Sequence, residues 1–380
     1  MKQLNEAWLK SPQTTSVMNA LGREAFFVGG CVRNSLIGAP VSDIDLATPL
    51  TPVEVTRLVE AAGLKAAPTG IDHGTVTVVA GDVAFEVTTF RRDVETDGRR
   101  AVVAFSTDIA EDAARRDFTM NALYATAEGE IVDPLGGLPD LEARRVRFIL
   151  DPEQRIREDA LRILRFFRFS AWYGEGIEPE GLAACAAHGA LVGSLARERV
   201  GAEMLKLLAA PDPAPAVSAM DACGVLARVL PGAKPLALAP LIAREREARV
   251  PPNPSIRLAA LAADEIDLRL SKKIEREVKE IRSIVEDQLS PARAGADFDE
   301  KRAIAGHLIL SALMPDPWAD IAAEIEMGAN AVFPIAAPDL IAAGIPFGPE
   351  LGRALERARQ IWIESRFSIG KDELLERLRE

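Results

Sequence analysis

The feature that most constrains this chain is the stretch from residue 26 to residue 48, where two glycines and an arginine follow a short apolar run. The apolar run predicts a buried strand, and Gly29 and Gly30 then let bare backbone N–H groups approach an anion at the start of a helix over 31–37. Arg33 belongs to the first turn of that helix. The segment therefore predicts a strand, a tight turn and a helix that together hold a phosphate.

Two aspartates one residue apart lie near the end of the same stretch. Residues 43–47 alternate in character, which predicts a strand with Asp43 and Asp45 on one face, about 6 to 7 Å apart. Ile44 and Leu46 point the other way, into a core. Two carboxylates so placed can bridge Mg²⁺ ions, so we expect Asp43 and Asp45 to be metal ligands and catalytic residues.

The composition favours a cytoplasmic protein with more than one domain. A chain of 380 residues with 48% hydrophobic residues exceeds what one compact core usually holds. The three cysteines are few, odd in number and far apart, which argues for a reducing compartment without a disulfide framework. No stretch approaches the roughly 20 apolar residues that span a bilayer, and the first ten residues lack the apolar region of a signal peptide. We therefore expect no membrane association.

The chain divides by pattern into a mixed head and a helical remainder. Between residues 25 and 133, β-rich runs alternate with helical segments, whereas from about residue 150 segments with a 3.6-residue period follow one another between Pro-rich connectors. These patterns predict an α/β or α+β head, and we take the fold as α+β, with a catalytic head over 1–145, a helical neck over 146–215 and a helical body and tail over 216–380.

Two neighbouring segments of the head carry further charged residues. Glu86 is the one acid of an apolar strand over 85–90, and it is either a surface side chain on an edge strand or a third acidic group beside the two aspartates. The stretch over 91–103 lacks apolar periodicity, and it predicts a mobile charged loop.

An Arg-Arg-Asp run at 115–117 interrupts apolar residues. Secondary-structure propensity alone does not account for such a run. It predicts a structural ion pair in which Asp117 orients Arg116 and keeps its guanidinium free of competing partners.

Residues 152–171 contain no helix breaker, and they predict one continuous helix. At about 100° per residue, Asp159, Arg162, Arg165 and Arg168 form a ladder among bulky apolar side chains. Arginines packed in this way need anionic or polar partners, and a nucleoside triphosphate would supply both.

One acid and one arginine of this ladder can recognise cytosine and adenine. Each of these bases presents an exocyclic amino donor beside a ring nitrogen acceptor, whereas uracil and guanine present a carbonyl oxygen and a ring N–H. Asp159 would accept from the amino group while Arg162 donates to the ring nitrogen. Such a pair selects C and A without a nucleic-acid template.

Three of these motifs together resemble those of one enzyme family. The sequence is similar to class II tRNA nucleotidyltransferases and bacterial poly(A) polymerases in Gly29-Gly30-x-x-Arg33 with Asp43-x-Asp45 and in Arg115-Arg116-Asp117-Phe118-Thr119-x-Asn121-Ala122. It is also similar to the class II family in Glu158-Asp159-x-x-Arg162. One residue departs from the pattern, because Asn34 stands where the family usually has aspartate.

The resemblance implies a nucleotidyltransferase head followed by a helical part that binds RNA. It implies addition of CMP and AMP from CTP and ATP to the 3′ end of tRNA, with Mg²⁺ as the cofactor; we infer no obligate protein partner. It also suggests Glu86 as a third catalytic acid and gives the loop over 91–103 a role in the change from adding C to adding A. The residues that it assigns to the nucleotide are Gly29, Gly30, Arg33, Arg116, Asp159, Arg162, Arg165 and Arg168.

Three other activities remain open. A bacterial poly(A) polymerase would be expected to have a basic tail that holds RNA, and this C-terminus is rich in Glu as well as Arg. A partial enzyme would add only CC or only A. A relative without catalytic activity would bind RNA alone, although the two aspartates argue against it.

The formal net charge of −12 is unusual for a protein that binds RNA. We therefore expect a bipolar distribution of charge, with local basic clusters that contact phosphates. The candidate clusters are Arg144, Arg145 and Arg147; Arg155 and Arg157; Arg197 and Arg199; and Lys272, Lys273 and Arg276.

Overall fold

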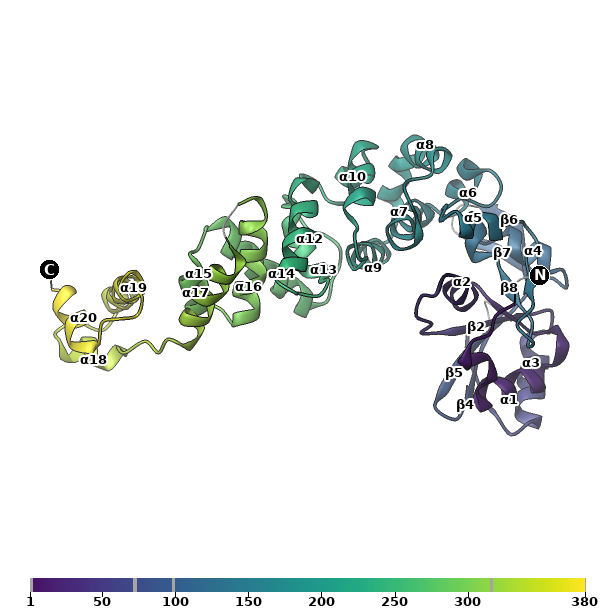
Figure 1. Cartoon of the computed structure of the whole chain (residues 1–380), viewed down its shortest axis with the longest axis horizontal. Helices are drawn as coiled ribbons and strands as arrows, with labels where there is room; N and C mark the ends of the chain where they lie inside the picture. Colours follow the sequence, from purple (N-terminus) through teal and green to yellow (C-terminus); the bar gives the residue numbers. More distant parts are fainter. Residues whose placement is uncertain (1–2, 71–73, 98–99, 315–316, 380) are drawn as a thin grey trace. The chain divides into compact units, whose positions relative to one another are not determined.

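The computed structural model describes residues 3–70, 74–97, 100–314 and 317–379. They form two compact units, Met1–Val229 and Leu230–Glu380. In the described residues, every strand belongs to the first unit, and the second unit is helical (Figure 1). The predicted α+β class, a mixed head followed by helices, is confirmed. The division into parts over 1–145, 146–215 and 216–380 stays a prediction.

A mixed seven-stranded sheet forms the head of the first unit. Its strand order is β3-β4-β5-β2-β1-β8-β9, and all neighbours are antiparallel except β2 and β5. The central parallel pair sets the candidate acids side by side. The strands are β1 Phe26–Val28, β2 Ile44–Thr48, β3 Lys65–Gly70, β4 Thr75–Ala80, β5 Val83–Thr89, β8 Tyr124–Ala125 and β9 Ile131–Val132.

Short helices accompany the sheet. The helix α2 begins at Gly30, directly after β1 and the turn at Gly29, as the sequence predicts. The helix α3 begins with a capping box, in which Thr51 and Glu54 exchange hydrogen bonds between side chain and backbone. The helices of the head are α1 Pro12–Leu21, α2 Gly30–Ile37, α3 Pro52–Ala61, α4 Ile109–Ala114 and α5 Leu138–Glu142.

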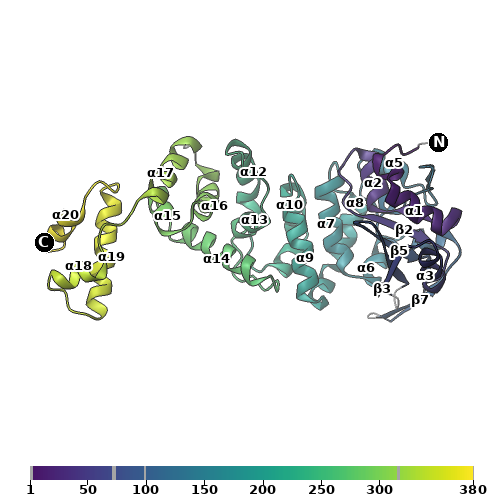
Figure 2. The ribbon, with the colours of Figure 1, turned by 90° about the horizontal axis from the view of Figure 1, so that it is seen from below.

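An aromatic cluster joins the head to the neck helices. Phe118 and Phe148 of the head pack against Phe166 and Phe169 of α7, with ring centroids 5.1 Å apart for Phe118 and Phe169 and 5.5 Å apart for Phe148 and Phe166. The helix α7 also lies beside α9 and α10 (Figure 2). The neck helices are α6 Pro152–Glu158, α7 Leu161–Tyr173, α8 Pro179–His188, α9 Arg197–Leu208, α10 Ala214–Ala222 and α11 Val225–Val229.

The prediction of one continuous helix over 152–171 is wrong. The chain leaves the helix at Asp159, which has φ −147° and ψ 105°, and α7 begins two residues later. The Asp159 carboxylate accepts a hydrogen bond from the N–H of Leu161 at 3.0 Å. Aspartate competes in this way with the helical backbone, so a helix can stop where no Gly or Pro is present.

The prediction of a loop over 91–103 is also wrong. The segment forms a two-stranded antiparallel sheet of β6, Arg91–Asp97, and β7, Arg100–Phe105. Residues 98 and 99 lie outside the described residues. A hairpin is held by the backbone hydrogen bonds between its two strands, and these bonds need no apolar periodicity in the sequence.

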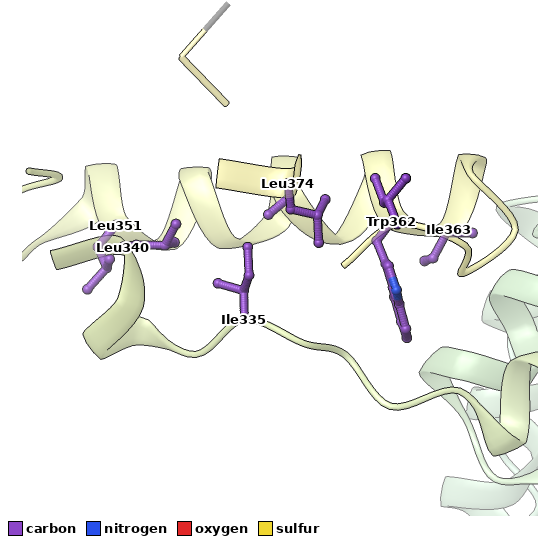
Figure 3. Close-up of a cluster of buried hydrophobic side chains, with 8 residues drawn as sticks. Ile335, Leu340, Leu351, Trp362, Ile363 and Leu374 are labelled. Carbon is purple, nitrogen blue, oxygen red and sulfur yellow. The ribbon is translucent and has the colours of Figure 1, made fainter. Parts of the chain in front are cut away.

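The second unit consists of helices around several small cores. Ile284, Ala294, Ala303 and Ile325 form one of them. The last core contains Ile335, Leu340, Leu351, Trp362 and Leu374, between the three C-terminal helices (Figure 3). The helices are α12 Leu238–Glu247, α13 Pro254–Ala260, α14 Lys272–Glu286, α15 Pro291–Asp297, α16 Glu300–Leu310, α17 Trp318–Asn330, α18 Ala337–Ala342, α19 Pro349–Glu364 and α20 Lys371–Arg377.

Two glycines allow α15 and α17 to touch backbone to backbone. A Cβ atom on Gly328 would lie 2.0 Å from the carbonyl oxygen of Ala292, and one on Gly295 would lie 2.2 Å from that of Ile325. No real Cβ atom approaches a backbone oxygen so closely. Both positions therefore require glycine.

None of the helices in the described ranges combines the length and the apolar character needed to cross a bilayer.

Candidate active site

Three acids lie near the centre of the head sheet. Asp45 lies in β2 and is in register with Glu86 on the parallel strand β5. Asp43 lies one residue before β2, is exposed, and accepts a hydrogen bond from Ser42 Oγ at 2.8 Å. Because β5 lies between β4 and β2, Glu86 is not on an edge strand. Residues in register on parallel neighbours face the same side of a sheet, so Glu86 joins the side that carries Asp45.

The pKa of Asp45 responds to its acidic neighbours. Burial is the main cause that raises the pKa of the Asp45 carboxyl to about 6. Negative charge on Glu86 and on Asp43 raises it further, while the guanidinium of Arg116 acts in the opposite direction. Like charges that disfavour one another in this way are stabilised by a cation between them.

The carboxylates fit a divalent cation by their chemistry. In residues 3–70, 74–97, 100–314 and 317–379, no three His, Cys, Asp or Glu side chains are already arranged as a metal site. Hard cations such as Mg²⁺, however, are bound by one or two carboxylates together with water and substrate phosphates. Asp43 and Asp45 supply such donors, and Glu86 lies beside Asp45.

The glycine pair forms a tight turn after β1. Gly29 has φ +68°, a conformation that favours glycine, and its N–H donates to the carbonyl of Leu123 at 3.2 Å. A Cβ atom on Gly29 would lie 3.6 Å from Nη1 of Arg116. The turn thus brings bare backbone next to an arginine at the start of α2.

Arg33 is only 6% exposed and is held by neutral groups. Its guanidinium donates to the amide oxygens of Asn34 and Asn121 and, at 2.9 Å, to the hydroxyl of Tyr173, and it stacks 4.0 Å from the centre of the Tyr173 ring. Burial lowers the pKa of Arg33. Since Tyr173 belongs to α7, Arg33 joins the glycine-turn helix to the neck.

The structure explains how asparagine serves at position 34. Its amide oxygen accepts from Nη2 of Arg33 at 2.8 Å, and its amide nitrogen donates to the carbonyl of Pro40 at 2.7 Å. An aspartate could make the first contact but could not donate to a carbonyl. Asn34 therefore ties Arg33 to the segment that leads to Asp43.

The prediction that Asp117 orients Arg116 is wrong. The two oxygens of Asp117 accept from Asn121 and from Arg165 of α7, and Arg165 holds the pKa of the buried Asp117 low against the effect of burial. Arg116 instead donates to Asp112, four residues earlier, at 3.0 Å. Adjacent side chains diverge at the end of a helix, whereas residues four apart meet.

Asp159 and Arg162 lie at the start of α7 and are held by protein groups. One oxygen of Asp159 caps Leu161, and the other accepts from Arg199 of α9 at 3.0 Å. Arg162 donates to Glu158 at 2.8 Å and to the carbonyl of Arg115 at 3.1 Å. The pair is thus positioned by the break in the helix and not by the predicted ladder.

The two remaining arginines of the predicted ladder have different surroundings. Arg165 donates to Asp117 of the head, whereas Arg168 donates to Glu203 of α9 at 2.5 Å and stacks 4.4 Å from the centre of the Phe169 ring. Arg168 is only 13% exposed. It therefore fastens α7 to α9.

A cavity of about 490 Å³ lies between the glycine turn and α7. Eight of the predicted site residues line it, namely Gly29, Gly30, Arg33, Asp45, Arg116, Asp159, Arg162 and Arg165. Asp43, Glu86 and Arg168 do not. Arg91, Arg115, Asp117, Asn121 and Phe169 complete the lining.

Several residues of this site were missed in the sequence. Asp112 and Tyr124 hold Arg116, and Tyr173 holds Arg33. The spacing of Asp112 three and four residues before the arginine pair is a signal that could have identified it. Tyr124 and Tyr173 carry no local signal, because only the folded sheet and neck bring them to the arginines.

The predicted basic clusters of the first unit are largely engaged within the protein. Arg155 is buried and donates to the carbonyl of Arg116 at 2.8 Å. Arg145 and Arg147 both pair with Asp140, and they line, with Arg144, a separate cavity of about 590 Å³. Their contact with phosphates stays a prediction, as does that of Lys272, Lys273 and Arg276 in the second unit.

Comparison with protein families gives two matches along the chain. The family model of the poly(A) polymerase head domain matches residues 25–147. A second family model, described as a probable RNA and SrmB-binding site of polymerase A, matches residues 176–236. The first match contains the acids and the glycine turn, and the second contains α9.

Relatives of the chain include proteins that match along most of their length. The chain is 31% identical over 400 residues to the mitochondrial CCA tRNA nucleotidyltransferase 1 of Homo sapiens, and the match covers 99% of this chain and 88% of the human protein. It is 39% identical over 215 residues to the CCA-adding enzyme of Levilactobacillus brevis, and this match covers 56% of this chain and 53% of that enzyme.

Solved structures share the fold over nearly the whole chain. The Bacillus stearothermophilus CCA-adding enzyme in complex with CTP has a TM-score of 0.75 at 28% identity, covering 97% of this chain and 98% of that one. The Thermotoga maritima CCA-adding enzyme complexed with tRNA-CCA has a TM-score of 0.70 at 19% identity, covering 100% and 99%. At 19% identity, the similarity to the Thermotoga maritima enzyme shows a shared fold and nothing more.

Proposed function

Because this chain belongs to the family of CCA tRNA nucleotidyltransferases, we propose that it adds CMP and AMP from CTP and ATP to the 3′ end of tRNA. The addition needs no nucleic-acid template and releases pyrophosphate. The observation that carries the proposal is the single cavity that Asp45 of the head shares with Asp159 and Arg162 of the neck. A group suited to binding a cation and a pair suited to reading a base therefore face the same ligand space.

The chemistry assigns the tRNA 3′-hydroxyl as the nucleophile. Its oxygen attacks the α-phosphorus of the nucleotide in line, and the bond from that phosphorus to the oxygen of the departing pyrophosphate breaks. Nucleotidyltransferases of this family use divalent metal ions, and we infer Mg²⁺ held by Asp43 and Asp45. The bound cations would lower the pKa of the hydroxyl and neutralise charge on the pyrophosphate.

The protein's own groups orient the nucleotide. Gly29 and Gly30 present backbone to the triphosphate, and Arg116 lies beside them. Asp159 would accept from the amino group of cytosine or adenine, and Arg162 would donate to the ring nitrogen. Arg33 and Arg165 line the same cavity and add positive charge. We assign Arg168 to the nucleotide only through its link to Phe169, which lines the cavity.

Glu86 would act as a third acid. Glu86 lies in register with Asp45 and raises the pKa of the Asp45 carboxyl. A cation bound at Asp45 would therefore also be attracted by the negative charge of Glu86. Its role is therefore electrostatic support of the aspartate pair.

One assay tests the proposed function. A tRNA that lacks its terminal CCA is incubated with CTP alone, with ATP alone and with both, and the products are sized on a denaturing gel. We expect two additions with CTP alone and three with both nucleotides. A long A-tail with ATP alone would identify a poly(A) polymerase, and arrest after CC with both nucleotides would identify a partial enzyme. Binding of the tRNA without any addition would identify the protein as an RNA-binding relative without catalytic activity.

We also infer that the protein works in the cytoplasm. Its three cysteines are few, odd in number and far apart in the sequence, which fits a reducing compartment. The mammalian relatives are named as mitochondrial proteins. Fractionation of the source cells distinguishes the two locations.

A further inference from the structure

Asp112 of α4 is a buried acid at which four donors meet. It is 1% exposed. Its Oδ1 accepts from Nε of Arg115 at 2.9 Å and from the backbone N–H of Arg91 at 3.3 Å. Its Oδ2 accepts from Nη2 of Arg116 at 3.0 Å and from the hydroxyl of Tyr124 at 2.7 Å. Both oxygens of this carboxylate are thus fully engaged inside the head.

The arrangement leaves one end of Arg116 free to bind a ligand. Nε of Arg116 donates to Tyr124 at 3.1 Å, and Nη2 donates to Asp112. Within the part of the chain that the structure describes, Nη1 has no hydrogen-bond acceptor, and it lies beside the Gly29 turn. A guanidinium fixed at two nitrogens presents its third at a set position, as recognition of a phosphate oxygen requires.

The charges of the cluster favour an anion. Asp112 carries one negative charge, and Arg115 and Arg116 carry one positive charge each. Burial acts to raise the pKa of Asp112, but the two arginines and the Tyr124 hydroxyl hold it below its usual range. The carboxylate therefore stays ionised, and one positive charge remains for a ligand in the cavity that both arginines line.

The same residue connects three elements around the cavity. The backbone N–H of Arg91 begins β6, so Asp112 holds the base of that hairpin. Arg115 follows α4, and its carbonyl accepts from Arg162 of α7. A change at Asp112 is thus transmitted to the phosphate side and to the base-reading side of the cavity.

We propose that Asp112 is the positioning residue that holds Arg116 toward the triphosphate of the bound nucleotide. The proposal rests on the proposed function, because the triphosphate is that of CTP or ATP. Asp112 itself does not line the cavity, so it acts on the nucleotide through the groups that it holds, chiefly Arg116. Hydrogen bonds to charged groups are the stronger ones, so loss of this orientation should weaken nucleotide binding by roughly tenfold to a hundredfold.

Asp112→Asn tests the proposal, because it keeps the size and one acceptor but removes the charge. The binding of CTP and of ATP is measured by calorimetry, and the KM for each nucleotide and for tRNA is measured in the addition assay. We expect both nucleotides to bind about tenfold or more weakly, with their KM raised and the KM for tRNA unchanged. A purely structural loss would instead lower the fraction of active enzyme at unchanged KM.

A double-mutant cycle shows whether Asp112 acts through Arg116. In an Arg116→Ala background, Asp112→Asn should weaken CTP binding by no more than about twofold, because the group that it positions is gone. Fully additive effects would overturn the proposal, and so would normal nucleotide KM values in the single variant.

Glu245→Gln provides the matched control. Glu245 is an equally buried acid that pairs with Arg257 at 2.7 Å in the second unit. The Glu245→Gln change should lower the thermal stability of the protein while the KM for each nucleotide stays unchanged. A wild-type enzyme that adds no nucleotide would refute the proposed function itself, whereas a fully active Asp112→Asn variant refutes only the inference.

Discussion

Single arginines in the cavity are oriented by acids that are not their sequence neighbours. Arg116 pairs with Asp112 and Arg165 pairs with Asp117, and each pair is buried or partly buried. Removing one member of such a pair leaves a buried charge without a partner. The stability lost in this way is much larger than the stability that the intact pair contributes. The acids that hold the arginines are therefore expected to matter for stability as well as for the position of the guanidinium groups.

Asp43→Asn should abolish addition of both nucleotides while tRNA binding is retained. A metal-bound carboxylate supports several kcal/mol of transition-state stabilisation, so we expect kcat to fall by about a thousandfold or more. Single-turnover addition and a filter-binding assay with tRNA measure the two properties. Asp82→Asn, in the exposed turn between β4 and β5, should behave as wild type. Normal turnover by Asp43→Asn would refute its role as a metal ligand.

Asp159→Asn should relax the choice of base. An amide can donate as well as accept, so it no longer rejects the carbonyl oxygen of uracil. Because one bidentate contact discriminates by about 1 to 3 kcal/mol, the preference for CTP over UTP in kcat/KM should fall by roughly tenfold to a hundredfold. Glu153→Gln, an exposed change in α6 away from the cavity, is the control. An unchanged preference would remove Asp159 from base selection.

The conformation of two elements depends on contacts that the sequence pattern does not reveal. The helix stops at Asp159 because its carboxylate caps the N–H of Leu161, and this stop places the carboxylate at the cavity. The hairpin of β6 and β7 forms where periodicity predicted a loop. In both cases the deciding contact, a side-chain cap at Asp159 or the pairing of two strands, leaves no trace in the apolar periodicity of the sequence.

Gly328→Ala should destabilise the second unit through the contact between α15 and α17. The added methyl group would lie 2.0 Å from the carbonyl oxygen of Ala292, and backbone cannot yield as a side chain does. Overpacking of this kind costs about 1 to 3 kcal/mol or more, and urea unfolding measures it. Gly352→Ala in α19, where nothing lies within 4 Å, should raise stability by roughly 0.5 to 1 kcal/mol. Equal effects of the two changes would contradict this account of the helix contact.

At the scale of the whole molecule, the two units carry different parts of the chemistry. Every predicted catalytic and nucleotide-binding residue lies in the first unit. The second unit has its own cores and a buried ion pair between Arg257 and Glu245, so its stability rests on separate contacts. Their responses to pH should therefore differ.

Acidification should destabilise the second unit through His307. This side chain is 4% exposed, and its Nε2 has no hydrogen-bond partner among the residues that the structure describes. Burial lowers the pKa of His307 below its ordinary value of 6.5, although a hydrogen bond with the Ser290 backbone opposes the shift. Below pH 6.5 the unfolded chain takes up a proton that the folded chain does not, so stability is lost as pH falls.

The loss is measured by hydrogen exchange of α16 amides between about pH 7.5 and about pH 5.5, corrected for the intrinsic rates. One histidine contributes at most about 1.4 kcal/mol per pH unit. His307→Gln should flatten the dependence, whereas His188→Gln in the first unit should not change it. An equally steep dependence in His307→Gln would assign the effect to other groups.

The sequence by itself determined the strand-turn-helix of the head and the α+β class, because short-range spacing and apolar periodicity fix these features. Most of the predicted cavity residues came from the resemblance of the motifs to a known family. Eight predicted residues do meet at one cavity. Only the tertiary structure decided which acid holds which arginine, that Arg168 fastens α7 to α9, and that Tyr124 and Tyr173 belong to the site. Pairings of this kind join elements far apart in the chain, so they depend on how the sheet and the neck pack.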